Sequence, residues 1–139
     1  VQDLEPVAGL TNLQKLCVGW NEISDISPVA NLSALTSLGI WNNRVTDISA
    51  VQNLKALTYL DFSGNRVQDI SAVAGLNSLS SLWMYSNRVS DFTSLEGLTE
   101  LKVLMIRDNP IADKASLQKV FPRLGRTDVD VIDRGGDAQ

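Results

Sequence analysis

The sequence of 139 residues predicts an α/β solenoid, a single unit built of short stacked turns, and three observations carry this prediction. Asparagine recurs every 22 residues, at Asn21, Asn43, Asn65, Asn87 and Asn109. Each asparagine follows the same phrase, a leucine and a second apolar residue two positions later, which is the alternation of a short strand. Hydrophobic residues make up 44% of the chain, enough for a core. Since one turn of this length cannot bury its own apolar face, successive turns must stack.

Each turn is expected to contribute one short strand to a parallel sheet. The first core position of the strands recurs as Leu16, Leu38, Leu60, Leu82 and Leu104. The second recurs as Val18, Ile40, Phe62, Met84 and Ile106. Stacking in this register places a continuous core behind the sheet.

The segment before each strand is expected to be tightly wound. Leu32, Leu35 and Leu38 lie three residues apart, which favours a 3₁₀ approach over a long helix. Further apolar columns supply the remaining core walls: Leu13, Leu35, Leu57, Leu79 and Leu101 before the strands, and Ile23, Val45, Val67, Val89 and Ile111 after them.

Two polar columns accompany the apolar ones. The asparagines stand where the chain leaves the sheet, and a side-chain amide offers the donors and the acceptor that the backbone needs there. The aspartates Asp3, Asp25, Asp47, Asp69, Asp91 and Asp113 are expected to accept local backbone hydrogen bonds in the convex turns. A calcium ladder is the alternative for this column, but one carboxylate per turn falls short of the six to eight oxygens that calcium prefers.

The repeat ends after Asn109, because the next strand leucine would fall at Arg126. Leu117, Val120, Phe121 and Leu124 then follow the spacing of an amphipathic helix, which predicts a C-terminal cap over the last apolar layer. Residues 129–133 are a candidate final edge strand. We therefore predict repeats over 1–113, in five to six turns with the first incomplete, a helical cap over 114–133 and a disordered tail over 134–139.

The N-terminal end is expected to be less well covered. Val1, Leu4, Val7 and Leu10 begin a repeat with no turn before them in this sequence. An uncovered apolar layer predicts either a missing upstream segment or self-association through this end.

Composition disfavours several classes of function. The net charge of −4 provides no broad positive field for nucleic acid or anionic lipid, and no run approaches the roughly 20 apolar residues that span a bilayer. The chain has no histidine and a single cysteine, Cys17, which excludes Cys/His metal frameworks and an intramolecular disulfide. Without a histidine base or a glycine-rich phosphate loop, neither an enzyme nor a cofactor site is predicted.

The phrases NEISDISPVANLSALTSL and NNRVTDISAVQNLKALTYL resemble the 22-residue leucine-rich repeats of the bacterial internalin family. The similarity covers about residues 1–113, and the Asp-Ile-Ser-Pro/Ala-Val connection is its specific part. The resemblance implies a right-handed arc with strands on the concave side and 3₁₀ segments on the convex side. The resemblance also implies a module that binds a protein partner on its concave face. A secreted or cell-surface location is favoured by this resemblance only. Neither a helical cap before Val1 nor a sorting signal is visible, so attachment to a surface is not carried over.

The repeat register places all three tryptophans and both tyrosines on the concave face. Trp41, Tyr59, Trp83 and Tyr85 are expected to form one contiguous patch, because neighbouring strands lie only about 4.8 Å apart. Gly19, Gly39 and Gly64 would leave hollows beside it. The frame of the patch would be Trp20, Asp61, Met105 and Arg107.

These aromatic residues have more than one interpretation. Tyrosine and tryptophan are enriched at protein interfaces, which predicts a protein-protein interaction module that binds a protein or peptide partner, with Asp61 receiving a lysine or arginine. Alternatively, the rings only cover the sheet and Asp61 is a solvated filler. The second functional hypothesis is a carbohydrate-binding surface, and the third is a passive structural spacer.

Overall fold

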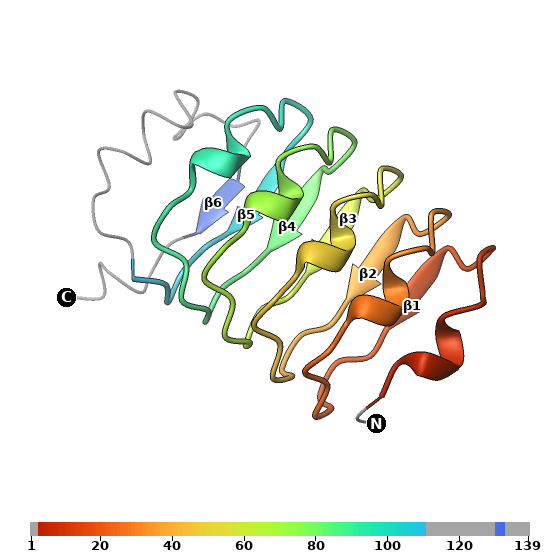
Figure 1. Ribbon diagram of the computed structural model, residues 1–139. Coiled ribbons are helices and arrows are strands. Elements are labelled where there is room, and N and C mark those ends of the chain that lie inside the picture. The colour runs from red at the N-terminus through yellow and green to blue at the C-terminus, as the bar shows by residue number, and fades with distance from the viewer. Residues whose placement is uncertain (1–2, 111–129, 133–139) are drawn as a thin grey trace.

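The computed structural model describes residues 3–110 and 130–132. Its strands form one parallel sheet of six, in the order β1-β2-β3-β4-β5-β6. The strands are β1 (Lys15–Cys17), β2 (Ser37–Gly39), β3 (Tyr59–Asp61), β4 (Ser81–Trp83), β5 (Val103–Met105) and β6 (Asp130–Ile132). Figure 1 shows the sheet as one layer with β1 and β6 at opposite ends, and the helical turns as a second layer in front of it. The chain is therefore a solenoid, with the strands lining its concave side.

The helical turns of the described residues are 3₁₀ helices, and none of them is an α-helix. They are η1 (Glu5–Val7), η2 (Ser27–Val29), η3 (Ser49–Val51), η4 (Ser71–Val73) and η5 (Thr93–Leu95). Within this part of the chain, no helix has the length and apolar character needed to cross a membrane.

The predicted strand register is confirmed. Leu38 pairs with Leu16 on one side and with Leu60 on the other, and the pairing continues through Leu82 to Leu104. The final strand departs from the period: Val131 pairs with Leu104, whereas the 22-residue repeat would place that partner at residue 126. The edge strand expected within residues 129–133 is thus present. The helical cap and the tail, predicted over 114–133 and 134–139, otherwise lie outside the described residues.

The core is continuous behind the sheet, as the apolar columns predict. Leu38, Ile40, Leu60 and Phe62 have no exposed surface, and the same holds for their equivalents in the next two turns, Leu82, Met84, Leu104 and Ile106. Burying each such side chain is worth about 1.5–3 kcal/mol relative to leaving it in water. The stacked layers therefore make a large contribution to the stability of the fold.

The N-terminal layer is less completely buried than the others. Leu13, Leu16 and Val18 are only partly buried, whereas Leu35, Leu38 and Ile40 one turn later are fully buried. Leu4 is 2% exposed, but Leu10 remains 50% exposed. This pattern agrees with an open first layer, while self-association through it stays a prediction.

The 3₁₀ helices begin earlier in the turn than the leucine spacing suggested. Ser27–Val29 forms η2, two residues after Asp25, whose Oδ1 accepts a hydrogen bond of 2.9 Å from the Ser27 N–H. Leu32 then donates to the Val29 carbonyl and Leu35 to the Leu32 carbonyl, each at 3.0 Å. The three-residue leucine spacing hence belongs to a series of i→i+3 turns that continues the helix toward the strand.

The asparagines hold neighbouring turns together. Asn65 Nδ2 donates to the Ile40 carbonyl of the preceding turn at 3.0 Å and to the Phe62 carbonyl of its own turn at 2.9 Å. Its Oδ1 accepts from the Val45 N–H at 2.9 Å. Asn43, Asn87 and Asn109 repeat this arrangement. The predicted role of the column is confirmed, and its amides join consecutive repeats.

Candidate functional site on the concave face

The sheet brings the predicted site residues into adjacent columns. Tyr59 of β3 lies between Ser37 and Ser81, and Asp61 lies between Gly39 and Trp83. The ladder continues beyond the strands, because the Asn42 N–H donates to the Ser63 carbonyl at 2.8 Å and the Gly64 N–H to the Tyr85 carbonyl at 2.9 Å. Met105 lies beside Trp83 on β5. The strand register therefore places these residues in neighbouring columns of the sheet.

The indole of Trp41 occupies the space above two glycines. A methyl group added at Gly19 would overlap the five-membered ring of Trp41, and one added at Gly39 would overlap its six-membered ring. At Gly64, where φ is +70°, an added methyl group would overlap the side chain of Asn42. The expectation of hollows beside these glycines is therefore wrong: the glycines make room for neighbouring side chains of the same sheet.

Asp61 lies buried in the centre of this surface. Only 7% of the residue is exposed. Its Oδ2 accepts a hydrogen bond of 3.2 Å from the Tyr59 hydroxyl, and its Oδ1 accepts one of 3.0 Å from the Ser63 N–H. The interpretation of Asp61 as a solvated filler is wrong, since neighbouring residues shield it from water.

Tyr59 has a strongly altered acidity. Burial, followed by the negative charge of Asp61 and the hydrogen bond to it, raises the pKa of Tyr59 to about 12. The phenol therefore stays protonated at physiological pH and remains the donor to Asp61.

The remaining aromatic residues are held by polar neighbours. The Trp83 indole N–H donates to Ser81 Oγ at 2.7 Å. The rings of Trp83 and Tyr85 meet edge to face, with their centroids 6.4 Å apart, and the Arg107 guanidinium carbon lies 4.7 Å from the centroid of Tyr85. These contacts restrict the conformations that the rings can adopt.

Trp20 stands apart from this cluster. It is 79% exposed and has a φ of 59°, in the left-handed region. The other turns place Asn42, Gly64, Ser86 and Asp108 in the same column, all with positive φ. Sequence reasoning missed this conformation, although the small and polar residue types of the column are a signal for it.

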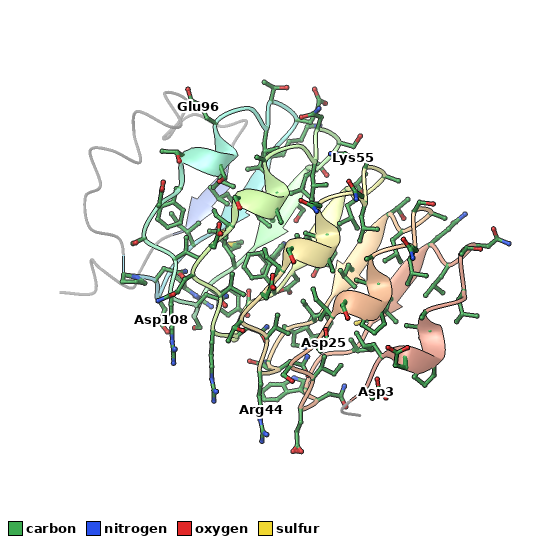
Figure 2. All side chains as sticks on the ribbon, in the orientation of Figure 1. Asp3, Asp25, Arg44, Lys55, Glu96 and Asp108 are labelled. Atoms are coloured by element: carbon green, nitrogen blue, oxygen red, sulfur yellow. The ribbon has the colours of Figure 1, made fainter. Side chains whose placement is uncertain are left out.

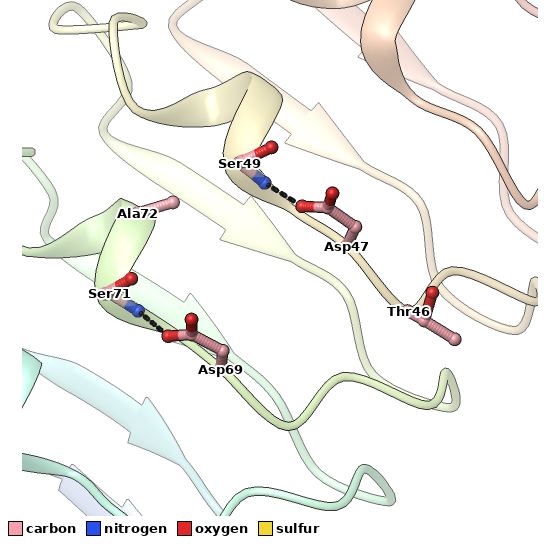
Figure 3. A pocket seen from close by; sticks show the side chains of 6 residues that line it. All are labelled: Thr46, Asp47, Ser49, Asp69, Ser71 and Ala72. Carbon is pink, nitrogen blue, oxygen red and sulfur yellow. Dashed lines mark hydrogen bonds between the residues drawn. The ribbon is translucent and has the colours of Figure 1, made fainter.

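The convex face has hollows of a different kind. One is lined by Thr46, Asp47, Ser49, Asp69, Ser71 and Ala72 (Figure 3). A similar one, lined in part by Asp69, Ser71, Asp91 and Thr93, follows a turn later. In both turns drawn, the aspartate Oδ1 accepts a 2.8 Å hydrogen bond from the N–H of the serine two residues on. A hollow that returns with the repeat reflects the spacing of the turns. No group of three or more acidic or cysteine side chains within the described residues is placed to hold a metal ion.

Some charged residues lie along the rims of the solenoid. Figure 2 shows Arg44 and Lys55 at opposite rims of the solenoid. Arg44 forms a 3.4 Å ion pair with Glu22, and both side chains are largely solvated. Cys17 is an exposed residue of β1.

Comparison with known proteins supports the repeat type. A family model described as leucine-rich repeats, two copies, matches residues 33–75 and 55–97. No curated protein sequence is significantly similar to the chain.

Among solved structures, the fold is similar to internalins of Listeria monocytogenes. Internalin C2 superimposes with a TM-score of 0.87 and 29% identity, over 96% of this chain and 57% of that chain. The internalin inlF superimposes with a TM-score of 0.74 and 33% identity, over 94% of this chain and 44% of that chain. A leucine-rich-repeat protein of Leptospira interrogans shares the fold, with a TM-score of 0.84 and 24% identity over 95% of this chain and 34% of that chain. The chain spans 57% or less of each of these structures.

Proposed function

The chain is an internalin-like leucine-rich-repeat protein with bacterial structural relatives, and we propose that it binds a protein or peptide partner through its concave aromatic face. The observation that carries this proposal is the ordered ring cluster. Trp83, Tyr85 and Arg107 are joined by an edge-to-face contact and a cation–π contact, and Trp41 packs on the sheet two strands away. Such half-buried, pre-ordered tryptophans and tyrosines are typical of binding hot spots.

The interpretation of the rings as a mere cover for the sheet is less well supported. The core side chains lie on the opposite face of the sheet from the rings, and from the second layer onward they are fully buried there. Trp20 contributes little to packing because most of its surface is exposed. An exposed tryptophan on the same face as the half-buried rings is more readily explained by a ligand.

Substitution of Trp83 by alanine tests the proposal. Ligands would be selected from a phage library of random peptides on the unmodified chain, and their affinities compared among variants. Trp83→Ala and Trp41→Ala should each weaken binding by about 2 kcal/mol or more, because each removes a desolvated anchor. Both variants should still fold, because the core on the other face of the sheet is unchanged. Gln52→Ala, an exposed change outside the concave face, is the control and should bind normally. If neither tryptophan variant loses affinity, the concave face is not the binding surface.

A carbohydrate surface is the second candidate, favoured by the indole of Trp41 lying across Gly19 and Gly39. An aromatic ring supported in this way can stack on a sugar. Saturable binding on a glycan array, abolished by Trp41→Ala, would place this function ahead of protein binding. A passive spacer would bind neither class of ligand.

A further inference from the structure

Asp61 is a buried carboxylate without a cation. Among the described residues, the ion pair within 4.0 Å is that of Arg44 with Glu22, and none involves Asp61. Of the basic residues on the same face, Arg107 is stacked on Tyr85, and Lys15 lies on β1, two strands from β3. The negative charge of Asp61 is therefore shielded from water but not balanced by a described positive group.

The two hydrogen bonds to Asp61 leave part of its capacity unused. An ionised carboxylate can accept about four hydrogen bonds, whereas the Tyr59 hydroxyl and the Ser63 N–H provide one to each oxygen. The neighbouring Ser63 hydroxyl is also buried and has no partner within the described residues. The polar floor between the rings, formed by Asp61 and Ser63, therefore has unused hydrogen-bonding capacity, which is uncommon for buried groups.

Aromatic side chains flank this floor on three sides. Trp83 stands next to Asp61 in the strand register, and Gly39 stands on the opposite side. The six-membered ring of Trp41 lies over Gly39, so a second indole approaches from there. Tyr59 precedes Asp61 by two residues on the same strand and contacts it through its hydroxyl. A cation that binds the carboxylate would also lie within reach of these rings, whose faces attract positive charge.

We propose that Asp61, with Trp41, Tyr59 and Trp83, forms a receptor for one lysine or arginine side chain of the partner, an inference that rests on the proposed function. The positive head group would complete the hydrogen bonding of the carboxylate, and its aliphatic stem would pack against the rings. Charge complementarity supports this occupant, because the net charge of the chain is −4 and the site itself is anionic.

The stability of an Asp61→Asn variant follows from the same reasoning. The asparagine can keep one oxygen acceptor for a hydrogen bond, while the cost of burying an unbalanced charge disappears. The variant should therefore unfold at the same temperature as the unmodified chain or above it. A carboxylate retained mainly for folding would show the opposite result.

The decisive experiment is a titration with small cations, followed by the indole N–H signals of Trp41 and Trp83 in nuclear magnetic resonance spectra. The probes are N-acetyl-arginine amide, N-acetyl-lysine amide and the neutral isostere N-acetyl-citrulline amide. The two cations should give saturable shifts, and citrulline amide should not. Asp61→Asn should weaken cation binding at least about tenfold. Asp69→Asn makes the same charge change on the convex face and should bind the cations normally.

Equal shifts with citrulline amide, or no saturable shift with either cation, would overturn the inference. The comparison of probes on the unmodified chain decides the matter even if Asp61→Asn does not fold. The outcome is also separable from that of the proposed function. Phage-selected ligands that depend on Trp83 but contain no required basic residue would uphold the binding face and refute the role of Asp61.

Discussion

At the scale of single residues, Trp20 combines a strained backbone with an exposed side chain. A bulky residue in the left-handed region costs about 1–2 kcal/mol, and the burial of Trp20 is too small to offset this cost. Asn42 adopts nearly the same conformation one turn later, with a φ of 54°, and asparagine tolerates that region. Trp20 is therefore a residue whose presence stability does not explain.

The substitution Trp20→Asn should raise the free energy of unfolding by about 1 kcal/mol, because asparagine relieves the left-handed strain. Denaturation with urea measures the change. If Trp20 frames the binding face, the same variant should lose affinity for ligands selected on the unmodified chain. A loss of stability would show that the indole makes packing contributions greater than its exposure indicates.

Asn65 illustrates the opposite case, a polar residue that the fold requires. Its amide satisfies two buried carbonyls and one buried N–H in two successive turns. Asn65→Ala should lower the free energy of unfolding by about 3 kcal/mol or more, because it leaves several buried backbone groups without partners. Asn53→Ala, at an exposed position, is the matched control and should have little effect. Similar stabilities for the two variants in urea denaturation would contradict the role of the column.

At the scale of elements, each 3₁₀ helix depends on the aspartate before it. The pKa values of Asp25, Asp47, Asp69 and Asp91 are lowered, in each case mainly by the backbone hydrogen bond from the serine or threonine two residues later. A depressed folded-state pKa means that the ionised form contributes stability. This contribution is present above the unfolded-state pKa of about 3.9 and is lost as the pH falls through the folded-state value.

The predicted consequence is a loss of stability on acidification below about pH 4. Asp69→Asn keeps an acceptor for the Ser71 N–H but cannot be protonated in this range, so its stability should decline less steeply. Unfolding by urea at a series of acidic pH values would measure the two slopes. If stability declined equally steeply with pH in both proteins, protonation of Asp69 would not be coupled to folding.

At the scale of the whole molecule, the stack makes stability depend on position. Each turn contacts its neighbours, and β1 has a described partner strand on one side only. The Val18 N–H donates to the Gly39 carbonyl in the partly buried first layer, and the Phe62 N–H donates to the Trp83 carbonyl in the middle of the stack. The Val18 amide hydrogen should therefore exchange with solvent faster than that of Phe62. Native-state hydrogen exchange would measure both amides. Uniform protection would indicate that the solenoid unfolds only as a whole.

The open first layer also bears on assembly. Self-association through this end predicts that sedimentation depends on concentration and that a charge in the layer, such as Leu10→Lys, abolishes the dependence. Leu10 is already half exposed, so the substitution should fold normally. A sedimentation coefficient that does not change with concentration would contradict self-association.

The sequence by itself determined the period, the strand register and both polar columns, because a strict 22-residue repeat forces equivalent residues into equivalent environments. It also assigned the aromatic residues to one face. Tertiary structure decided what that face is like: Trp41 fills the space over Gly19 and Gly39, Asp61 is buried, and Arg107 stacks on Tyr85. These features depend on side-chain directions across strands that are far apart in sequence. Spacing along the chain assigns a residue to a column. Only the packing of side chains between neighbouring columns decides which of them are buried and which neighbours they contact.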